Sequence, residues 1–176
     1  MTLARLRPYS VSLIADGLDA CGRRDQVLPP SFLRVAGSGR FEGVARFGDA
    51  GSGDVVVIAR AGRPSAVVTL RGVAGVIVDG VVADIDAARA VGLSVVAGTE
   101  PFTVEPGFVR LGGVSIVDGD LLFGDDDGVV CVPYDEALLE ELSAWLATTQ
   151  LREADSMAQL KEGQLLSVVY KANGQL

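Results

Sequence analysis

The stretch Ala74-Gly-Val-Ile-Val-Asp79 is an apolar run that ends in a carboxylate, and it decides the fold. A similar run, Val55-Val-Val-Ile-Ala59, precedes it, and a shorter one, Ser94–Ala97, follows it. Continuous runs of β-branched residues are typical of strands that are buried on both faces. Short helices are predicted between these strands, over Pro64–Leu70 and Ile85–Val91. Alternating strands and helices indicate a sheet with a parallel part.

The flanking segments add helices and antiparallel strands. Helical spacing of apolar residues predicts a helix over Ser10–Cys21 and another over Asp135–Lys161, with Gly163 as its stop. Turn sequences rich in Asp and Gly separate short strands in the second half of the chain. Short strands are expected at Val114–Val117, Leu121–Gly124 and Val129–Val132, and glycines and prolines delimit short segments at Phe32–Ala36 and Phe41–Phe47. We therefore expect one α/β domain over residues 1–176, with mixed parallel and antiparallel strands and a C-terminal helix.

Composition excludes several function classes. The 176 residues carry 15 Lys and Arg against 23 Asp and Glu, and this net charge of −8 argues against nucleic acid or an anionic membrane as a direct partner. The chain has no histidine, which excludes Ser-His-Asp and Cys-His catalysis and zinc sites built on histidine. No apolar run is long enough for a membrane span, and no secretory signal is recognised, so a cytoplasmic protein is expected.

Two groups of residues favour structural roles over chemistry. Cys21 and Cys131 lie far apart in apolar stretches, which predicts buried, reduced thiols. The acidic turns do not have the spacing of a calcium loop, and solvated turn carboxylates are the expected interpretation. These turns contain Asp118, Asp120, Asp125, Asp126 and Asp127.

The segment from Val78 to Asp84 is the best candidate for a site. A buried strand ends there in Asp79-Gly80, and Asp84 stands at the start of the following helix. Ligand sites in α/β proteins lie at the carboxyl ends of parallel strands. A carboxylate at this place could hold Mg²⁺, which keeps most of its waters and needs only one or two carboxylates. The alternative interpretation is that Asp84 only caps the helix.

Three stretches resemble the RraA-like family, which contains the regulator of ribonuclease E activity and class II 4-hydroxy-4-methyl-2-oxoglutarate aldolases that also decarboxylate oxaloacetate. They are Ile14–Gly22, Arg71–Gly80 and Gly112–Pro133, followed by a helix that carries Glu153. The resemblance covers nearly the whole chain, and its last motif is the most specific.

The resemblance implies a β/β/α sandwich of the swivelling-domain type, assembled as a homotrimer or a hexamer with active sites between subunits. In the family's enzymes an Arg-Asp pair follows the Asp-Gly motif. The resemblance thus implies Asp84 as the catalytic anchor of Mg²⁺ or Mn²⁺. Glu153 is a weaker metal candidate, as an outer-shell carboxylate at a neighbouring subunit's site, and an exposed helix position is the alternative interpretation. The implied substrate is a small 2-oxo or β-keto acid.

The sequence departs from the family in two places. Ala83 stands where the family has the arginine that grips the substrate carboxylate. The loop after Ala59 is short, and only Arg60-Ala-Gly-Arg63 remains of a longer glycine-rich segment. Arg60 and Arg63 are candidates to supply the missing positive charge to the substrate, although a solvated surface loop is the alternative interpretation.

Three functions remain open from the sequence. The first is a divergent lyase that uses a metal at Asp84, and it is the one we favour. The second is a non-catalytic regulatory or binding protein of the same fold, which the loss of the arginine at position 83 supports. The third is a protein whose reshaped pocket performs chemistry without a metal. Fold analogy alone does not separate them.

Overall fold

The fold is built on a seven-stranded sheet, which the computed structural model describes for residues 3–59, 65–66, 72–99, 102–105 and 107–172. The strand order is β1-β7-β5-β3-β2-β11-β12. β2, β3, β5 and β7 form a parallel block, and the pairings of β1, β11 and β12 are antiparallel. These strands are β1 (Leu33–Ala36), β2 (Phe41–Arg46), β3 (Val55–Ala59), β5 (Gly75–Asp79), β7 (Val95–Gly98), β11 (Leu121–Asp125) and β12 (Gly128–Val132). The expected mixed α/β class is confirmed.

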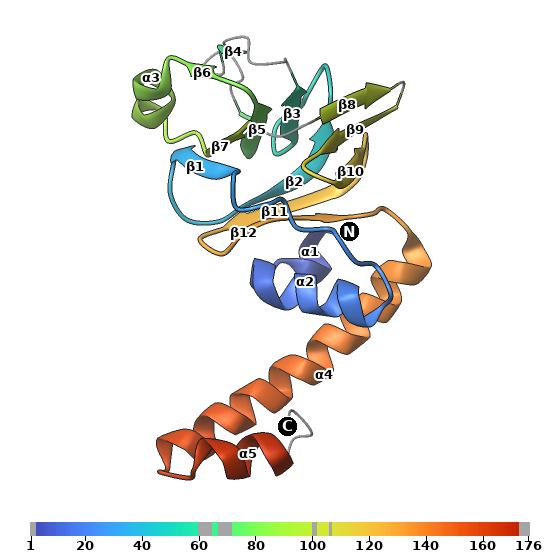
Figure 1. Cartoon of the computed structure of the whole chain (residues 1–176), viewed down its shortest axis with the longest axis vertical. Helices are drawn as coiled ribbons and strands as arrows, with labels where there is room; N and C mark the ends of the chain where they lie inside the picture. Colours follow the sequence, from blue (N-terminus) through green and yellow to red (C-terminus); the bar gives the residue numbers. More distant parts are fainter. Residues whose placement is uncertain (1–2, 60–64, 67–71, 100–101, 106, 173–176) are drawn as a thin grey trace.

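Three groups of elements cover the two faces of this sheet (Figure 1). A small antiparallel sheet packs on one face, and its side chains share a core with Phe41, Val57 and Ile77. It consists of β8 (Phe102–Glu105), β9 (Phe108–Leu111) and β10 (Val114–Val117). Helix α3 (Ile85–Ala90) packs on the other face of the parallel block.

The remaining helices cover the antiparallel end of the sheet. α1 (Leu3–Leu6), α2 (Val11–Ala20) and the first turns of α4 (Glu136–Lys161) bury a second core beneath β11 and β12. α4 then leaves the body, and α5 (Leu166–Ala172) folds back along its far end (Figure 1). In the described residues, no helix combines the length and apolar character of a membrane span.

One predicted helix was wrong within the described residues. A helix was expected over Pro64–Leu70, yet Ser65–Ala66 form strand β4, which pairs in parallel with β6 (Val82–Ala83). The partner strand supplies hydrogen bonds that local helical propensity does not outweigh in this short segment. The rest of the expected helix lies outside the described residues.

The buried carboxylate of Asp120 ties three segments together. Its Oδ2 accepts the amide of Val117 at 2.8 Å, and its Oδ1 accepts the amide of Tyr134, between β12 and α4, at 3.0 Å. The Cys131 thiol lies 3.7 Å from Oδ2. Asp120 is only 6% exposed, so the expectation of a solvated turn carboxylate was wrong for this residue. Turn chemistry shows where the chain reverses but not which carboxylate points inward.

Asp125 also differs from that expectation. Its Oδ2 accepts the backbone amide of Val11 at 2.8 Å, at the start of α2, and its Oδ1 accepts the amide of Asp127 at 2.9 Å. The carboxylate therefore joins the β11–β12 turn to α2, and this complements the N-cap bond that Ser10 makes to the amide of Leu13. Both carboxylates are structural anchors and are committed to backbone amides.

We predict that Gly124→Ala lowers the free energy of unfolding by about 1–3 kcal/mol, the range for overpacking a filled core. A Cβ at Gly124 would lie 2.2 Å from Cε1 of Phe41, whose ring occupies the space above this glycine. Gly48→Ala is the matched control because no atom lies within 4 Å of its added Cβ. Urea denaturation of both variants checks this. Equal stabilities would contradict the packing account.

A second prediction concerns pH. Burial, followed by the charge and hydrogen bond of Asp120, raises the pKa of the Cys131 thiol well above its ordinary value. The folded state therefore keeps a proton that the unfolded chain releases above about pH 8.5. The contribution of this thiol to stability is complete below that pH and declines as the pH rises further.

Wild type should lose more unfolding free energy than Cys131→Ala between pH 8 and pH 10, by at most about 1.4 kcal/mol per pH unit. Urea midpoints measured for both proteins across this range provide the test. Parallel curves would show that the thiol titrates alike in both states.

Candidate functional site

Three parallel strands end side by side at one edge of the main sheet. Ala59, Asp79 and Gly98 are aligned in register as the last residues of β3, β5 and β7. The amide of Gly80 donates to the carbonyl of Gly98 at 2.8 Å, so the chain leaves β5 in a fixed direction. This carboxyl edge is where ligand sites are expected in a parallel sheet.

Asp84 stands on the connection from this edge to α3. Its backbone adopts a left-handed conformation with φ 59° and ψ 38°. This conformation is uncommon outside glycine, and among the other residues aspartate and asparagine tolerate it best. Its carbonyl accepts the amide of Ala88 at 3.0 Å. The side chain makes no capping hydrogen bond to α3, so the alternative interpretation, in which this carboxylate caps the helix, was wrong.

The left-handed backbone explains this difference, because a capping side chain needs the extended N-cap conformation that Ser10 and Asp135 adopt in α2 and α4. The carboxylate of Asp84 is consequently exposed and not engaged with the helix that it precedes. It is a hard anionic oxygen donor at the carboxyl edge of the sheet.

Asp79 is a second carboxylate at this edge, and no role was predicted for it from the sequence. It is 3% exposed and engaged within the structure. The sequence did contain an indication of a special role for Asp79, since a buried aspartate at the end of an otherwise apolar strand is unusual. Because Asp79 is buried and already engaged, Asp84 is the exposed carboxylate donor at this edge.

The structure places the other predicted site residues differently. Ala83 is half-buried in β6, where it pairs with Ala66. Glu153 is exposed on the distal part of α4, far from α3 and β6 (Figure 1), so a single chain does not bring it to Asp84. Arg60 and Arg63 lie outside the described residues.

A divalent metal is the ligand that the residue types suggest. Within the described residues, no group of three or more His, Cys, Asp or Glu is arranged to enclose a metal ion. An enclosed, all-protein metal cage is therefore not present in that part of the chain. Asp84 fits the other kind of site, in which one or two carboxylates hold a Mg²⁺ that keeps several waters.

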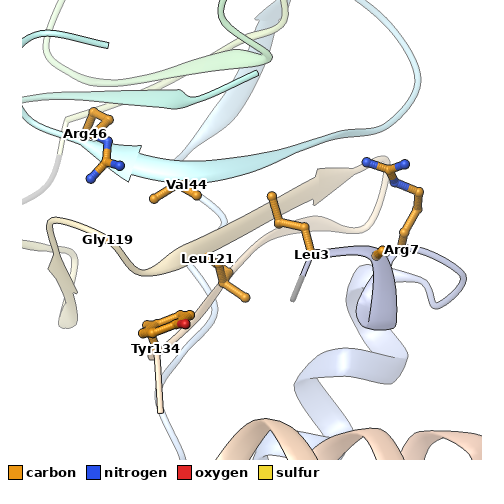
Figure 2. Close-up of a pocket in the computed structure, with 8 residues that line it drawn as sticks. Leu3, Arg7, Val44, Arg46, Gly119, Leu121 and Tyr134 are labelled. Atoms are coloured by element: carbon orange, nitrogen blue, oxygen red, sulfur yellow. The ribbon is translucent and has the colours of Figure 1, made fainter. Parts of the chain in front are cut away.

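A separate cavity of about 530 Å³ lies between α1 and the strands β2 and β11 (Figure 2). Its walls are formed mainly by Leu3, Val44 and Leu121, with two arginines at its rim. Both are already paired, since Arg7 lies 2.6 Å from Glu42 and Arg46 lies 3.0 Å from Asp118. The described lining contains no carboxylate or thiol, and it shares no residue with the carboxyl edge.

Comparisons with known proteins match this chain to one family. A family model described as RraA-like, Aldolase/RraA, matches residues 12–131, which is more than half of the chain. A protein of Halalkalibacterium halodurans named "Putative 4-hydroxy-4-methyl-2-oxoglutarate aldolase" is 26% identical over 181 residues, covering 86% of each chain.

Two solved structures show the same fold. An uncharacterized protein from Pseudomonas syringae pv. tomato has a TM-score of 0.76 at 21% identity, covering 96% of each chain. RraAS2 of Streptomyces coelicolor, described as an unusual member of the RNase ES inhibitor RraA protein family, has a TM-score of 0.66 at 22% identity, covering 88% of this chain and 94% of that one. With the family match, these findings establish that the chain belongs to the RraA-like family.

Proposed function

We propose that this protein is a divergent, metal-assisted carbon–carbon lyase that acts on a small 2-oxo or β-keto acid. The observation that carries the proposal is the carboxylate of Asp84, which is exposed at the carboxyl edge of the sheet and makes no capping bond. The family match and the aldolase-named relative support a lyase. A merely structural Asp84 would be expected to cap α3, as Asp135 caps α4.

Asp84 would hold Mg²⁺ or Mn²⁺ through a carboxylate oxygen. When bound, the ion supplies positive charge where negative charge develops on the substrate's carbonyl oxygen. The protein's own contribution is positional: β5 and the bond from Gly80 to Gly98 fix the path to Asp84, and the left-handed backbone directs its side chain away from capping.

Ala83 predicts that this activity is weak. A guanidinium beside Asp84 would grip the substrate carboxylate through two parallel hydrogen bonds and offset developing charge, and a methyl group does neither. Losing such a contact in a desolvated site costs about 2–5 kcal/mol, which corresponds to orders of magnitude in rate. Binding of the substrate carboxylate therefore depends on a cation elsewhere in the site, and Arg60 and Arg63 remain the candidates.

The same substitution favours a second function, a non-catalytic regulator. A protein of this fold that lacks the arginine keeps its surface but loses the contact with the substrate carboxylate. The Streptomyces relative is described as an unusual member of an RNase ES inhibitor family. In either function, we propose that the body assembles as a homotrimer or hexamer, as the family resemblance implies. Metal-dependent turnover separates the two functions, because only the lyase requires it.

We expect Asp84→Asn to abolish the binding of Mg²⁺ or Mn²⁺ observed by calorimetric titration, because an amide lacks the negative charge that a hard cation needs. Asp126→Asn is the matched control, since Asp126 is an exposed carboxylate in the β11–β12 turn. Binding by Asp84→Asn that equals wild type, or its loss in Asp126→Asn, would move the metal away from the carboxyl edge.

We expect Ala83→Arg to increase Mg²⁺-dependent pyruvate release from oxaloacetate on the order of tenfold, or about 1.4 kcal/mol, because a guanidinium restores the carboxylate contact. The rescue is partial, since the short loop after Ala59 is unchanged. The double variant Ala83→Arg/Asp84→Asn controls for metal-independent decarboxylation. A fast wild type with no gain in Ala83→Arg would refute this account of position 83, and metal binding without any turnover in either protein would favour the regulator.

A further inference from the structure

The cavity between α1, β2 and β11, which we call the α1 cavity, takes no part in the proposed lyase. Its volume of about 530 Å³ lies within the range of roughly 300–1,000 Å³ that is typical of small-molecule sites. Among the described residues, it shares no lining residue with the carboxyl edge of the main sheet. Its floor, its mouth and the charges at its two ends together indicate the chemical class of molecule that fits it.

The floor of the α1 cavity is a cross-strand apolar pair. Side chains alternate along β2, so Phe41 and Ala45 point into the core shared with the small sheet, while Val44 points to the opposite face. Val44 lies directly opposite Leu121 of the antiparallel strand β11, and both line the cavity together with Leu3 of α1 (Figure 2). None of these three side chains can form a hydrogen bond, so the floor favours a ligand with an apolar body.

Tyr134 stands at the mouth of the α1 cavity. Its backbone amide donates to Oδ1 of the buried Asp120 at 3.0 Å, which fixes the direction in which the chain leaves β12. Tyr134 is nevertheless 55% exposed, and its ring lies near Leu121 (Figure 2). A half-exposed aromatic ring beside an apolar floor loses further apolar surface to a ligand that covers both.

The two arginines of the α1 cavity lie on opposite sides of the floor (Figure 2) and differ in how their charge is balanced. Arg46 has two carboxylate partners, Asp54 at 3.5 Å and Asp118 at 3.0 Å. The end of the cavity at Arg46 therefore has no positive charge to spare.

Arg7, at the other end, shares one carboxylate with a second arginine. Its Nε lies 2.6 Å from Oε1 of Glu42, and Nε of Arg40 lies 3.2 Å from Oε2 of the same side chain. Arg40 also donates to the backbone carbonyl of Tyr9, whereas in the described part of the chain Arg7 makes no hydrogen bond through its two terminal nitrogens. One negative charge thus faces two guanidinium groups, and Arg7 retains the donors that a further anion needs.

We propose that the α1 cavity binds a small monocarboxylate with a hydrocarbon chain, of the size of a medium-chain fatty acid. The carboxylate accepts two parallel hydrogen bonds from the terminal nitrogens of Arg7. The hydrocarbon chain covers Val44 and Leu121 and ends beside the ring of Tyr134. Because the cavity shares no described residue with the carboxyl edge and the ligand needs no 2-oxo group, the proposal does not rest on the proposed lyase.

Length and charge disfavour other classes of ligand. Glu42 and Arg46 lie four residues apart on one face of β2, so the floor is about 13 Å long at roughly 3.3 Å per residue, which suits an extended chain of medium length. A sugar or a nucleotide would find no hydrogen-bonding side chain along the floor, and Arg7 would repel a cation. The two carboxylates beside Arg46 would repel a second carboxylate, so a monocarboxylate fits better than a dicarboxylate.

The test follows the backbone amide signals of the ¹⁵N-labelled protein during titration with octanoate. Signals of residues 3–7, 44–46, 119–121 and 134 should shift together and saturate, with a Kd on the order of 1 mM or lower. Each methylene added between butanoate and octanoate should tighten binding about fourfold, because the floor removes it from water. Absence of saturable shifts, shifts confined to residues 80–86, or equal affinities for butanoate and octanoate would overturn the proposal.

A matched pair of variants tests the role of the charge. Arg7→Gln should weaken octanoate binding about tenfold or more, because the amide of glutamine has no positive charge to pair with the carboxylate. Arg5→Gln removes the same charge from the same helix, and Arg5 is exposed and does not line the cavity. This control should bind octanoate within about twofold of wild type, because salt screens a distant surface charge.

A third variant tests the space itself. Ala4 is exposed and lines the α1 cavity, so the indole of Ala4→Trp should fill it and abolish octanoate binding. Urea unfolding of Ala4→Trp should stay close to that of wild type, because position 4 lies outside the core. Undiminished binding by Ala4→Trp or by Arg7→Gln, or an equal loss in Arg5→Gln, would overturn the proposal. Loss of metal binding or of turnover in Asp84→Asn, by contrast, should leave octanoate binding unchanged.

Discussion

Parallel pairing of β5 with β3 on one side and β7 on the other is the constraint on which the molecule depends. All five residues of β5 are buried, and both of its edges are paired, so the sheet requires a covering layer on each face. Ile77 points into the core shared with the small sheet, while Val76 and Val78 point into the core beneath α3. The alternation of side chains along one strand thereby explains why the fold has layers on both sides.

The same constraint creates the candidate site. Because β3, β5 and β7 end in register, the chain leaves β5 at an edge that backbone pairing has already fixed, with Asp79 buried and Gly80 held by Gly98. Two residues of β6 then lead to Asp84, whose left-handed backbone costs energy that the surrounding structure must offset. An exposed carboxylate that performs no capping at this edge supports the proposal that the position serves binding.

The main strands and the long helices could be predicted from the sequence, because each has a clear apolar pattern: the runs at residues 55–59 and 74–79, and the helical spacing in α2 and α4. β4 and β6 could not, since two-residue strands have no periodicity and exist only through their pairing. The inward turn of Asp120 was likewise invisible, because it depends on amides of Val117 and Tyr134 from different segments. For the site, the sequence located Asp84 but not its backbone conformation, which decides whether the carboxylate caps α3 or is available to a cation.

The central claim is that a divalent cation binds at the carboxyl edge of β5 and not at the acidic turns. The most direct measurement is paramagnetic broadening of backbone amide signals during titration of the ¹⁵N-labelled protein with Mn²⁺. The account predicts that signals of residues 80–86 disappear first, while those of residues 125–128 persist at the same Mn²⁺ concentration. First loss of the signals of residues 125–128, or uniform broadening of both segments, would contradict it.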